Sequence, residues 1–426
     1  MKNLNVLDTL FVGIDVSSKS NVVCAMDFNS DILMRCSVDN NQTGACELSA
    51  KLGELLVGSH FTTAVIALES TSFYGIHIAN YLSADESLSA YGPYVYCLNP
   101  KMVSNYRKSF IGIGKTDPTD AFVIADFARV GRISTEPWRG SQFLALQRLT
   151  RHRLHLSECI TREKTYMVSN IFLKFSELAV LENDDRPFSS NHTATAEAIL
   201  TEMLSLEDIC NLSSEELIEF VCLHSHNRYQ DPDKVAKLLS KAARDSYRLD
   251  KCLYEPLTVS IASSFNCIEA YQKEIKTING AIGRAIRGLD PYGFQILMSI
   301  PGIGPVFASG ILAEIGNIHA FHSADALAKY AGIYWNRNQS GDFDAEDRSM
   351  SKAGNKYLRY YLIEATDSIR KHAPEFAEYY QKKYDESKTH HHKRALALTS
   401  RKTIRLIYGL LANDQLYSAD RVYSTS

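Results

Sequence analysis

The sequence lacks the cysteine pattern of a disulfide-stapled or zinc-binding protein. It has 9 cysteines in 426 residues, an odd number, and no Cys-x-x-Cys pair. This argues against a disulfide framework and a zinc site and favours a reducing compartment. The first eight residues show no basic-then-apolar signal pattern, and the longest uncharged stretch, Pro291–Ala313, carries prolines and glycines that disfavour a membrane-spanning helix. We therefore expect a cytoplasmic protein without a membrane segment.

An excess of basic charge, the usual sign of a nucleic-acid partner, is also missing. Lys plus Arg total 46 and Asp plus Glu total 49, so the formal net charge is −3. In this total, basic segments cancel acidic ones. Residues 101–170 carry 12 basic and 6 acidic side chains, 171–220 carry 2 and 11, and 351–410 carry 13 and 6. Charge therefore has to be assigned by segment, and the two basic blocks are candidates for nucleic-acid contact.

Residues 1–138 alternate strand and helix signals. Strand-like runs occur at Thr9–Val16, Asn21–Phe28, Thr63–Leu68 and Tyr94–Leu98. The polar stretch between the first two runs is typical of a hairpin, and helical patterns follow the last two. Strands that alternate with helices predict an α/β domain.

The rest of the chain has mainly helical periodicity, and we divide it at residue 288. Residues 139–288 contain a basic amphipathic helix, an acidic insertion at about 177–245 and a returning helix; a solvated linker or a dimerising helix pair is the simpler interpretation of this region alone. In 289–426, a turn at Pro301–Pro305 between two helical segments predicts a helix–hairpin–helix. The backbone of Gly302 and Gly304 could meet a phosphate there, or the glycines could serve only a tight corner.

Four carboxylates stand out by their position. Asp15 and Glu69 each end an apolar strand, and Asp117 and Asp120 lie three residues apart at a helix start. Carboxylates gathered in this way repel one another unless a cation lies among them, and Mg²⁺ or Mn²⁺ prefers such oxygen ligands. Two such ions can clamp the attacking and leaving oxygens of a phosphodiester. Each carboxylate alone also fits a cap or a turn, so the hypothesis depends on all four together.

Ser340 is a candidate nucleophile in the polar loop Asn338–Asp342. The sequence has no G-x-S-x-G elbow, so nothing supports a hydrolase of that type. Arg348, Lys352 and Arg359 follow, either as phosphate ligands or as a solvated charged face. Further along, 393–405 holds five basic residues and no acid, which favours contact with a nucleic-acid backbone through Lys393, Arg394, Arg401 and Lys402.

These motifs, in this order, resemble the DEDD transposases of the insertion-sequence one-ten family, also called Piv-type. The N-terminal motifs are FVGIDVSSKSN, VIALEST, LNPKMV and KTDPTDA. The C-terminal motifs are SIPGIGPVFASGILAEIG, LAKYAGIYWNRNQSG, SKAGNKYLRYYLIEAT and HHKRALALTSRKTIRLIYGLL. Several ordered motifs spread over nearly the whole chain are far more specific than any one of them.

The resemblance implies a RuvC-like domain of ribonuclease H fold, a coiled-coil connection and a mostly α-helical transposase domain. It assigns the DEDD tetrad to Asp15, Glu69, Asp117 and Asp120, with Mg²⁺ or Mn²⁺, and the serine nucleophile to Ser340. Members of the family are recombinases guided by a noncoding bridge RNA that pairs with target and donor DNA. They cut and rejoin DNA through a phosphoserine link in a composite site between protomers.

The implied partners are double-stranded target and donor DNA, a bridge RNA, and further copies of the chain in a dimer or tetramer. The implied location is the nucleoid of a bacterial or archaeal cell. Asn336 and Ala353 depart from the residues that relatives often carry around the serine loop, and the acidic part at 177–220 has no assigned counterpart.

Two other functions remain open at this point. One is a RuvC-like metal-dependent Holliday-junction resolvase or nuclease in which Ser340 is only structural. The other is a catalytically inactive DNA- or RNA-binding protein, against which the four intact carboxylates argue.

Overall fold

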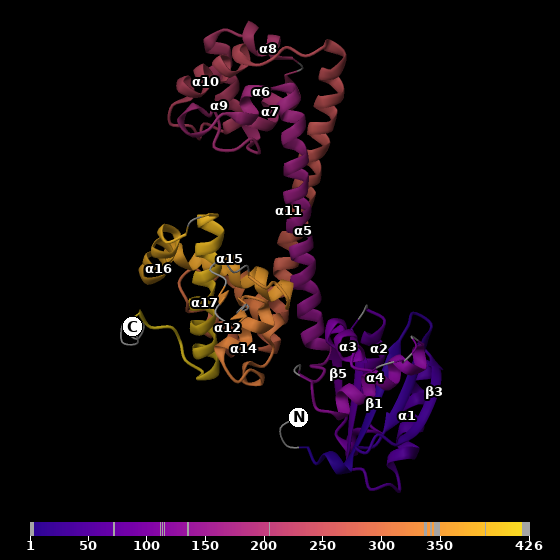
Figure 1. Cartoon of the computed structure of the whole chain (residues 1–426). Coiled ribbons are helices and arrows are strands. Elements are labelled where there is room, and N and C mark those ends of the chain that lie inside the picture. The colour runs from indigo at the N-terminus through magenta and orange to yellow at the C-terminus, as the bar shows by residue number, and fades with distance from the viewer. Residues whose placement is uncertain are drawn as a thin grey trace. The chain divides into compact units, whose positions relative to one another are not determined.

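The computed structural model describes residues 4–70, 73–110, 112, 114, 116–133, 136–203, 205–335, 339–340, 343–344, 350–387 and 389–419. The chain forms two compact units, one of Met1–Gln147 with Leu289–Ser426 and one of Arg148–Gly288. Helices α5 (Ser141–Lys174) and α11 (Lys251–Leu289) begin or end in the first unit and run through the second (Figure 1).

The N-terminal part of the first unit is built on one five-stranded sheet. Its strands are β1 (Thr9–Val16), β2 (Ser20–Met26), β3 (Ile32–Asp39), β4 (Thr63–Glu69) and β5 (Tyr94–Leu98), in the order β3-β2-β1-β4-β5. Strands β1, β4 and β5 are parallel, and β2 is antiparallel to both of its neighbours. The predicted α/β domain with its initial hairpin is therefore confirmed.

Helices cover both faces of this sheet (Figure 1). The helices are α1 (Gln42–Leu56), α2 (Gly75–Ala84), α3 (Pro100–Arg107) and α4 (Asp117–Arg129). Helices α1 and α2 share one buried core with Leu10, Val12 and Ile14 of β1, whereas α3 and α4 share another with Phe11. Because neighbouring strand residues point to opposite faces, the two cores divide each central strand by parity.

Strand β3 was not among the predicted elements. Most of its residues are exposed, and Ile32 and Leu33 are each about two-fifths exposed. An edge strand of this kind owes its conformation to its ladder with β2 rather than to an alternating apolar pattern. A sequence pattern that depends on burial therefore gives little sign of it.

The C-terminal part of the first unit is mainly helical, as predicted. Its helices are α12 (Pro291–Met298), α13 (Pro305–Ile315), α14 (Ala324–Ala331), α15 (Lys356–His372), α16 (Pro374–Asp385) and α17 (His391–Ala412). A two-stranded ladder, β6 (Gln339–Ser340) with β7 (Phe343–Asp344), lies between α14 and α15 in the sequence. None of the helices in the described ranges is both long and apolar enough to cross a membrane.

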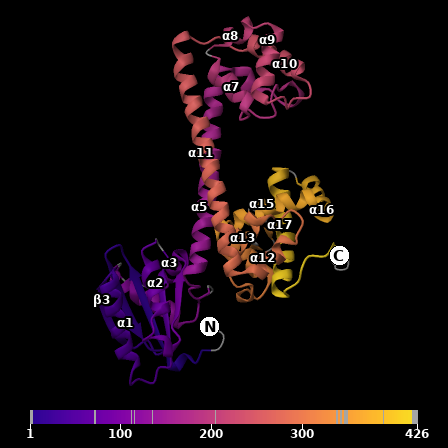
Figure 2. The same cartoon turned by 180° about the vertical axis from the view of Figure 1, so that it is seen from behind.

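The second unit is an antiparallel pair of long helices that carries a small helical module. Asn170 donates to Ser260, and Ser264 donates to Glu163, so residue numbers fall along α11 as they rise along α5. The module consists of α6 (Ser176–Val180), α7 (Ala194–Glu202), α8 (Leu206–Asn211), α9 (Ser214–Ser225) and α10 (Pro232–Asp245). It packs on one end of the pair, around a core that it shares with α5 and α11 (Figure 2).

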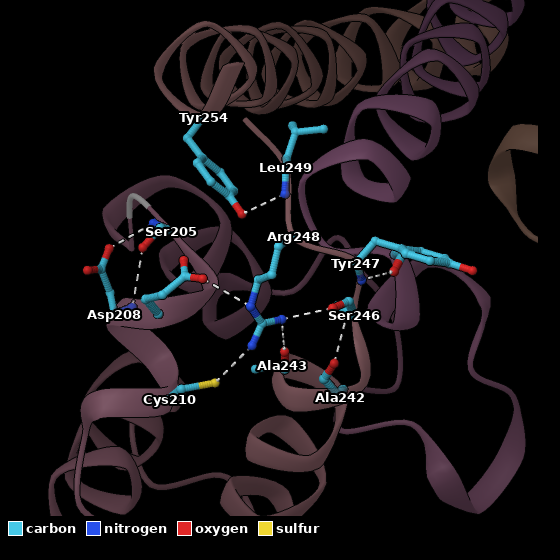
Figure 3. A network of polar contacts seen from close by, with 12 residues as sticks. Ser205, Asp208, Cys210, Ala242, Ala243, Ser246, Tyr247, Arg248, Leu249 and Tyr254 are labelled. Carbon is cyan, nitrogen blue, oxygen red and sulfur yellow. Dashed lines mark hydrogen bonds and ion pairs between the residues drawn. The ribbon is translucent and has the colours of Figure 1, made fainter. Parts of the chain in front are cut away.

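Arg248 joins two helices of this module (Figure 3). Its guanidinium donates to the carbonyls of Ala243 and Ser246, both at 2.8 Å, and its Nε lies 3.0 Å from a carboxylate oxygen of Glu207. The contacts therefore connect α8 to the end of α10. Nearby, Tyr254 accepts a hydrogen bond from the backbone of Leu249, which fixes the turn into α11.

Lys174 is buried at the end of α5 and ties α5 to α7 and α11. Its ammonium donates to the carbonyls of Leu200 and Met203 and to the hydroxyl of Thr258. Burial lowers the pKa of Lys174 to about 8. A cation at the C-terminal end of α7 satisfies carbonyls that have no partner inside that helix.

A glycine pair tests how closely α4 must approach the sheet. A methyl group at Gly13 would collide with the backbone of Ala121 and Ala125, whereas one at Gly53 in α1 would meet no atom within 4 Å. We expect Gly13→Ala to destabilise the domain by about 2–3 kcal/mol, because backbone cannot give way as a side chain can. Gly53→Ala is expected to stabilise it by about 0.5–1 kcal/mol, because alanine is the better helix former.

The measurement is the apparent melting temperature of each full-length variant by circular dichroism. The two substitutions add the same methyl group, so a fall for Gly13→Ala together with a rise for Gly53→Ala isolates the α4–β1 contact. Equal melting temperatures for the two variants would contradict the close approach.

Candidate active site

Asp15 and Glu69 lie side by side at the end of the sheet. The parallel register pairs Ile14 of β1 with Leu68 of β4, and each carboxylate is the next residue along its strand. Ile14 and Leu68 point into the core beneath α1 and α2. Because side chains alternate, Asp15 and Glu69 face the opposite side, which α4 covers, and both are half-buried.

Asp117 and Asp120 begin helix α4 on that same side of the sheet. The backbone of Ala121 lies against Gly13, two residues before Asp15. The other end of α4 lies at the opposite end of β1, because Arg129 donates to the carbonyl of Phe28 at 3.0 Å and β2 runs antiparallel to β1. The topology therefore brings both aspartates of α4 to the end of the sheet at which Asp15 and Glu69 lie.

These carboxylates fit a divalent cation in kind but not in their present arrangement. In the described part of the chain, no three His, Cys, Asp or Glu side chains form a group that could hold a metal ion. Asp120 is engaged by the guanidinium of Arg107, which also donates to the carbonyl of Gly114 at 3.0 Å. A side-chain cation thus neutralises one member of the predicted tetrad.

Arg107 was missed by the sequence analysis. It lies in the basic block 101–170, a candidate for nucleic-acid contact, and nothing in the local pattern links it to Asp120 thirteen residues later. Its neighbour Tyr106 fixes its place: the Tyr106 hydroxyl donates to the buried carboxylate of Asp126 at 2.6 Å. Burial, with Asp126 beside it, raises the pKa of Tyr106 to about 12, so the phenol remains a donor at all ordinary pH values.

Ser340 lies in a segment whose two ends are held together. Its backbone pairs with Phe343 in the β6–β7 ladder. Trp335 and Met350 form a bridge, and Ser351 donates from its backbone to the carbonyl of Tyr334 at 2.8 Å. Arg348 and Asn336 lie outside the described residues.

Arg359 clamps the base of this serine loop rather than presenting a free charge. Its guanidinium donates to the carbonyl of Ala331 before the loop, at 3.1 Å, and to that of Lys352 after it, at 2.9 Å. Burial lowers the pKa of Arg359. The sequence left Arg359 as a phosphate ligand or part of a solvated charged face. The structure gives it a different role, because Arg359 holds the two ends of the loop. Lys352 is exposed and adopts a positive φ of 54° at the clamp.

The turn between α12 and α13 has a structural reason for one of its glycines. Gly302 has a φ of +91°, and a methyl group there would lie 2.8 Å from the Cα of Ile369 in α15. Gly304 is the N-cap of α13 and has open space around it. The tight corner therefore accounts for Gly302, while phosphate contact at the turn stays a prediction.

The four residues of α17 that were predicted to contact a nucleic-acid backbone fall into two classes. Lys393 and Arg394 are exposed in the first turn. Arg401 and Lys402 are half-buried and have partners: Arg401 pairs with Asp325, and Lys402 donates to the carbonyl of Glu375 at 2.9 Å. Sequence spacing does not separate the two classes, because it does not reveal which face of α17 is covered.

Two family models match the chain. A DEDD transposase model of the IS110 type, described as "Transposase", matches residues 12–173. A model described as "Transposase IS116/IS110/IS902 family" matches residues 294–381. The four carboxylates lie in the first match and Ser340 lies in the second, and together the matches cover more than half of the chain.

Relatives align along nearly the whole chain. The "Insertion element IS900 uncharacterized 42 kDa protein" of Mycobacterium paratuberculosis is 25% identical over 411 residues, which is 96% of this chain and 97% of the relative. The "Insertion element IS116 uncharacterized 44.8 kDa protein" of Streptomyces clavuligerus is 22% identical over 419 residues, 96% of each chain. The "Transposase for insertion sequence element IS1111A" of Coxiella burnetii is 30% identical over 125 residues, 29% of this chain and 30% of the relative.

The clamp at Arg359 predicts how firmly the serine loop is held. We expect Arg359→Met to expose the loop to trypsin, which cuts after the Arg337 and Arg348 that the sequence places there. Loss of the two hydrogen bonds should speed cleavage about fivefold, the equivalent of about 1 kcal/mol. The measurement is the rate of appearance of the two cleavage products by mass spectrometry.

The control is Arg370→Met on the same helix. Arg370 pairs with Asp367 within α15 and lies over the ring of Tyr380 in α16. Equal cleavage rates in the two variants would show that Arg359 does not hold the loop.

Proposed function

This chain belongs to the IS110 family of insertion-sequence transposases, which are enzymes that act on DNA, and we propose that it cuts and rejoins DNA through a phosphoserine intermediate under the guidance of a bridge RNA. The proposal rests on the placement of Asp15 and Glu69 at the C-terminal ends of two adjacent parallel strands, with helix α4, which begins with Asp117 and Asp120, packed on the same face of the sheet. Ser340, in a loop with clamped ends, is the proposed nucleophile.

The proposed reaction conserves the phosphodiester bond. The Ser340 hydroxyl loses its proton to water as its Oγ attacks a DNA phosphorus and a Ser–O–P bond forms. The bond to the departing deoxyribose oxygen breaks, and that oxygen takes up a proton. A hydroxyl of the new strand then attacks the same phosphorus, and the serine is released. A serine hydroxyl is a weak nucleophile, so it needs activation by its surroundings. Storing the bond on serine allows rejoining without an external energy source.

A divalent metal is implied by the DEDD family, and we infer that it is Mg²⁺ or Mn²⁺. When bound, such an ion stabilises the negative charge that develops on the phosphoryl oxygens. Asp15, Glu69 and Asp117 would hold it, together with Asp120 once Arg107 releases that carboxylate. The four side chains offer carboxylate oxygens as metal ligands, which is the ligand type that both ions prefer.

The proposed partners are double-stranded target and donor DNA, a bridge RNA and further copies of the chain, from dimer to tetramer. If base pairing by the RNA selects the sequence, the protein needs backbone contacts more than base contacts. The exposed Lys393 and Arg394 at the start of α17 suit that role. Phosphate contacts by Gly302, Gly304, Lys352 and Arg348 belong to the same proposal.

The serine chemistry has a direct test in cells that carry the protein with its own insertion element. We expect wild-type protein, isolated under denaturing conditions, to retain covalently attached DNA, and Ser340→Ala to retain none, because no other group would supply the nucleophile. Ser351→Ala, at the foot of the same loop, is the control and should retain DNA as the wild type does.

Persistence of the covalent species in Ser340→Ala would overturn the phosphoserine step. DNA cleavage by that variant without any adduct would favour the nuclease or junction resolvase. Asp15→Asn with unchanged recombination would remove the carboxylates from the mechanism.

Competition between Arg107 and a metal for Asp120 gives a second test. We expect Arg107→Gln to bind Mn²⁺ more tightly than the wild type by about tenfold, or about 1.4 kcal/mol, because a carboxylate is freed. Asp120→Asn should bind it more weakly. Isothermal titration calorimetry with Mn²⁺ alone measures both, without any need for catalysis.

Lys108→Gln is the matched control, since Lys108 is exposed and next in sequence to Arg107. A gain in affinity equal to that of Arg107→Gln would mean that general charge, not release of Asp120, is responsible. Unchanged Mn²⁺ affinity in Asp120→Asn would exclude Asp120 as a ligand.

A further inference from the structure

A cavity of about 530 Å³ lies in the C-terminal part of the first unit, between α16, α17 and the segment that leads into the serine loop. Helices α16 and α17 lie side by side in both views of the chain (Figures 1 and 2). The cavity is lined by three aromatic side chains, three cations and one leucine: Tyr334, Trp335, Tyr379, Leu398, Arg401, Lys402 and Arg405. No acidic side chain is among its described lining residues.

Two of the three cations of the cavity, Arg401 and Lys402, are held by hydrogen bonds to backbone carbonyls. Arg401 donates to the carbonyl of Ile333 at 3.3 Å and pairs with Asp325, and Lys402 donates to the carbonyl of Glu375. These bonds leave further N–H donors, because a guanidinium has five and an ammonium three. Arg405, one turn further along α17, is exposed.

The aromatic side chains give the cavity flat apolar surfaces next to this charge. The ammonium of Lys402 lies 5.4 Å from the ring centre of Tyr379 and 4.8 Å from that of Phe376. Trp335 is held by its bridge to Met350 at the start of the serine loop, five residues before Ser340. Rings beside cations, with no acid in the described lining, match a ligand that has a planar face and a negative charge.

A nucleotide has both features, and the cavity volume is in the range of about 300–1,000 Å³ that small-ligand sites occupy. A base inside a duplex is covered on both faces by its neighbours, so only an unpaired or extruded base can stack on a side chain. The cavity therefore favours a nucleotide that has left its stack over an intact double helix.

We propose that this cavity binds one unpaired nucleotide, with its base stacked against Trp335 or the neighbouring tyrosine rings and its phosphate at Arg405 and Arg401. The proposal rests on the proposed function and deepens it, since it names a contact for the nucleic acid next to the reacting serine. Occupation of the cavity would hold the start of the serine loop through Trp335. The nucleotide comes from either a DNA strand or the RNA, which share this chemistry.

Fluorescence separates this site from the rest of the protein, because the chain has only 2 tryptophans, Trp138 and Trp335. In Trp138→Phe, all indole emission comes from Trp335. The probes are single-stranded DNA and RNA of the same sequence, about 12 nucleotides long, and the blunt DNA duplex of that sequence. Fluorescence anisotropy of a dye on each probe reports binding independently of tryptophan.

We expect single strands to quench the emission of Trp138→Phe as they bind, and the duplex to quench it far less. Whichever of DNA and RNA quenches at the lower concentration identifies the source of the nucleotide. In Trp335→Phe the remaining emission should stay constant, which assigns the quenching to Trp335. Arg405→Gln should weaken single-strand binding about fivefold and reduce the slope of log affinity against log salt by about 0.7.

Lys382→Gln is the control for charge, because it removes an exposed cation of α16 that does not line the cavity. Circular dichroism melting curves show whether each variant is folded. Binding by anisotropy with constant Trp335 emission, quenching by the duplex equal to that by single strands, or equal effects of Arg405→Gln and Lys382→Gln would each overturn the proposal. The DNA adduct of Ser340 would be unaffected by those results, so the proposed function would stand or fall separately.

Discussion

The contact between α4 and β1 at Gly13 is the constraint on which the proposed active site depends. Only a hydrogen atom fits between β1 and the backbone of Ala121 and Ala125. This approach fixes where α4 begins, and α4 begins with Asp117 and Asp120. A larger side chain at residue 13 would move the helix away from the sheet, and two carboxylates would move with it.

Like charges of carboxylates repel one another, and the chain compensates the charge of one of them, Asp120, with the guanidinium of Arg107. Arg107 neutralises Asp120 from α3, and Tyr106 and Asp126 hold α3 against α4. The ion pair compensates the charge of Asp120 within the protein itself. The same pairing requires that Arg107 give way before Asp120 can bind one, which makes the folded arrangement and the proposed chemistry compete for one carboxylate.

Basic residues divide in a similar way between structure and exposed surface. Arg359 holds the serine loop, Lys174 ties the helical module together, and Lys402 caps the carbonyl of Glu375. Lys393, Arg394 and Arg405 are exposed. The helices of the acidic segment, α6 to α10, share one buried core with α5 and α11. Segment charge alone therefore overstates how many cations face a nucleic acid.

The sequence by itself determined the α/β start, the helical remainder and the family, because periodicity and ordered motifs are local properties. The roles of Asp15, Glu69, Asp117, Asp120 and Ser340 stay predictions from those motifs. Only the tertiary structure decided which side chains meet. The pairing of Arg107 with Asp120, the clamp of Arg359 and the aromatic cavity at Trp335 each join segments that are separate in the chain. Edge strand β3 needed its partner β2 to exist at all. These contacts depend on packing distances and on which helix face is covered, and no local sequence pattern encodes either.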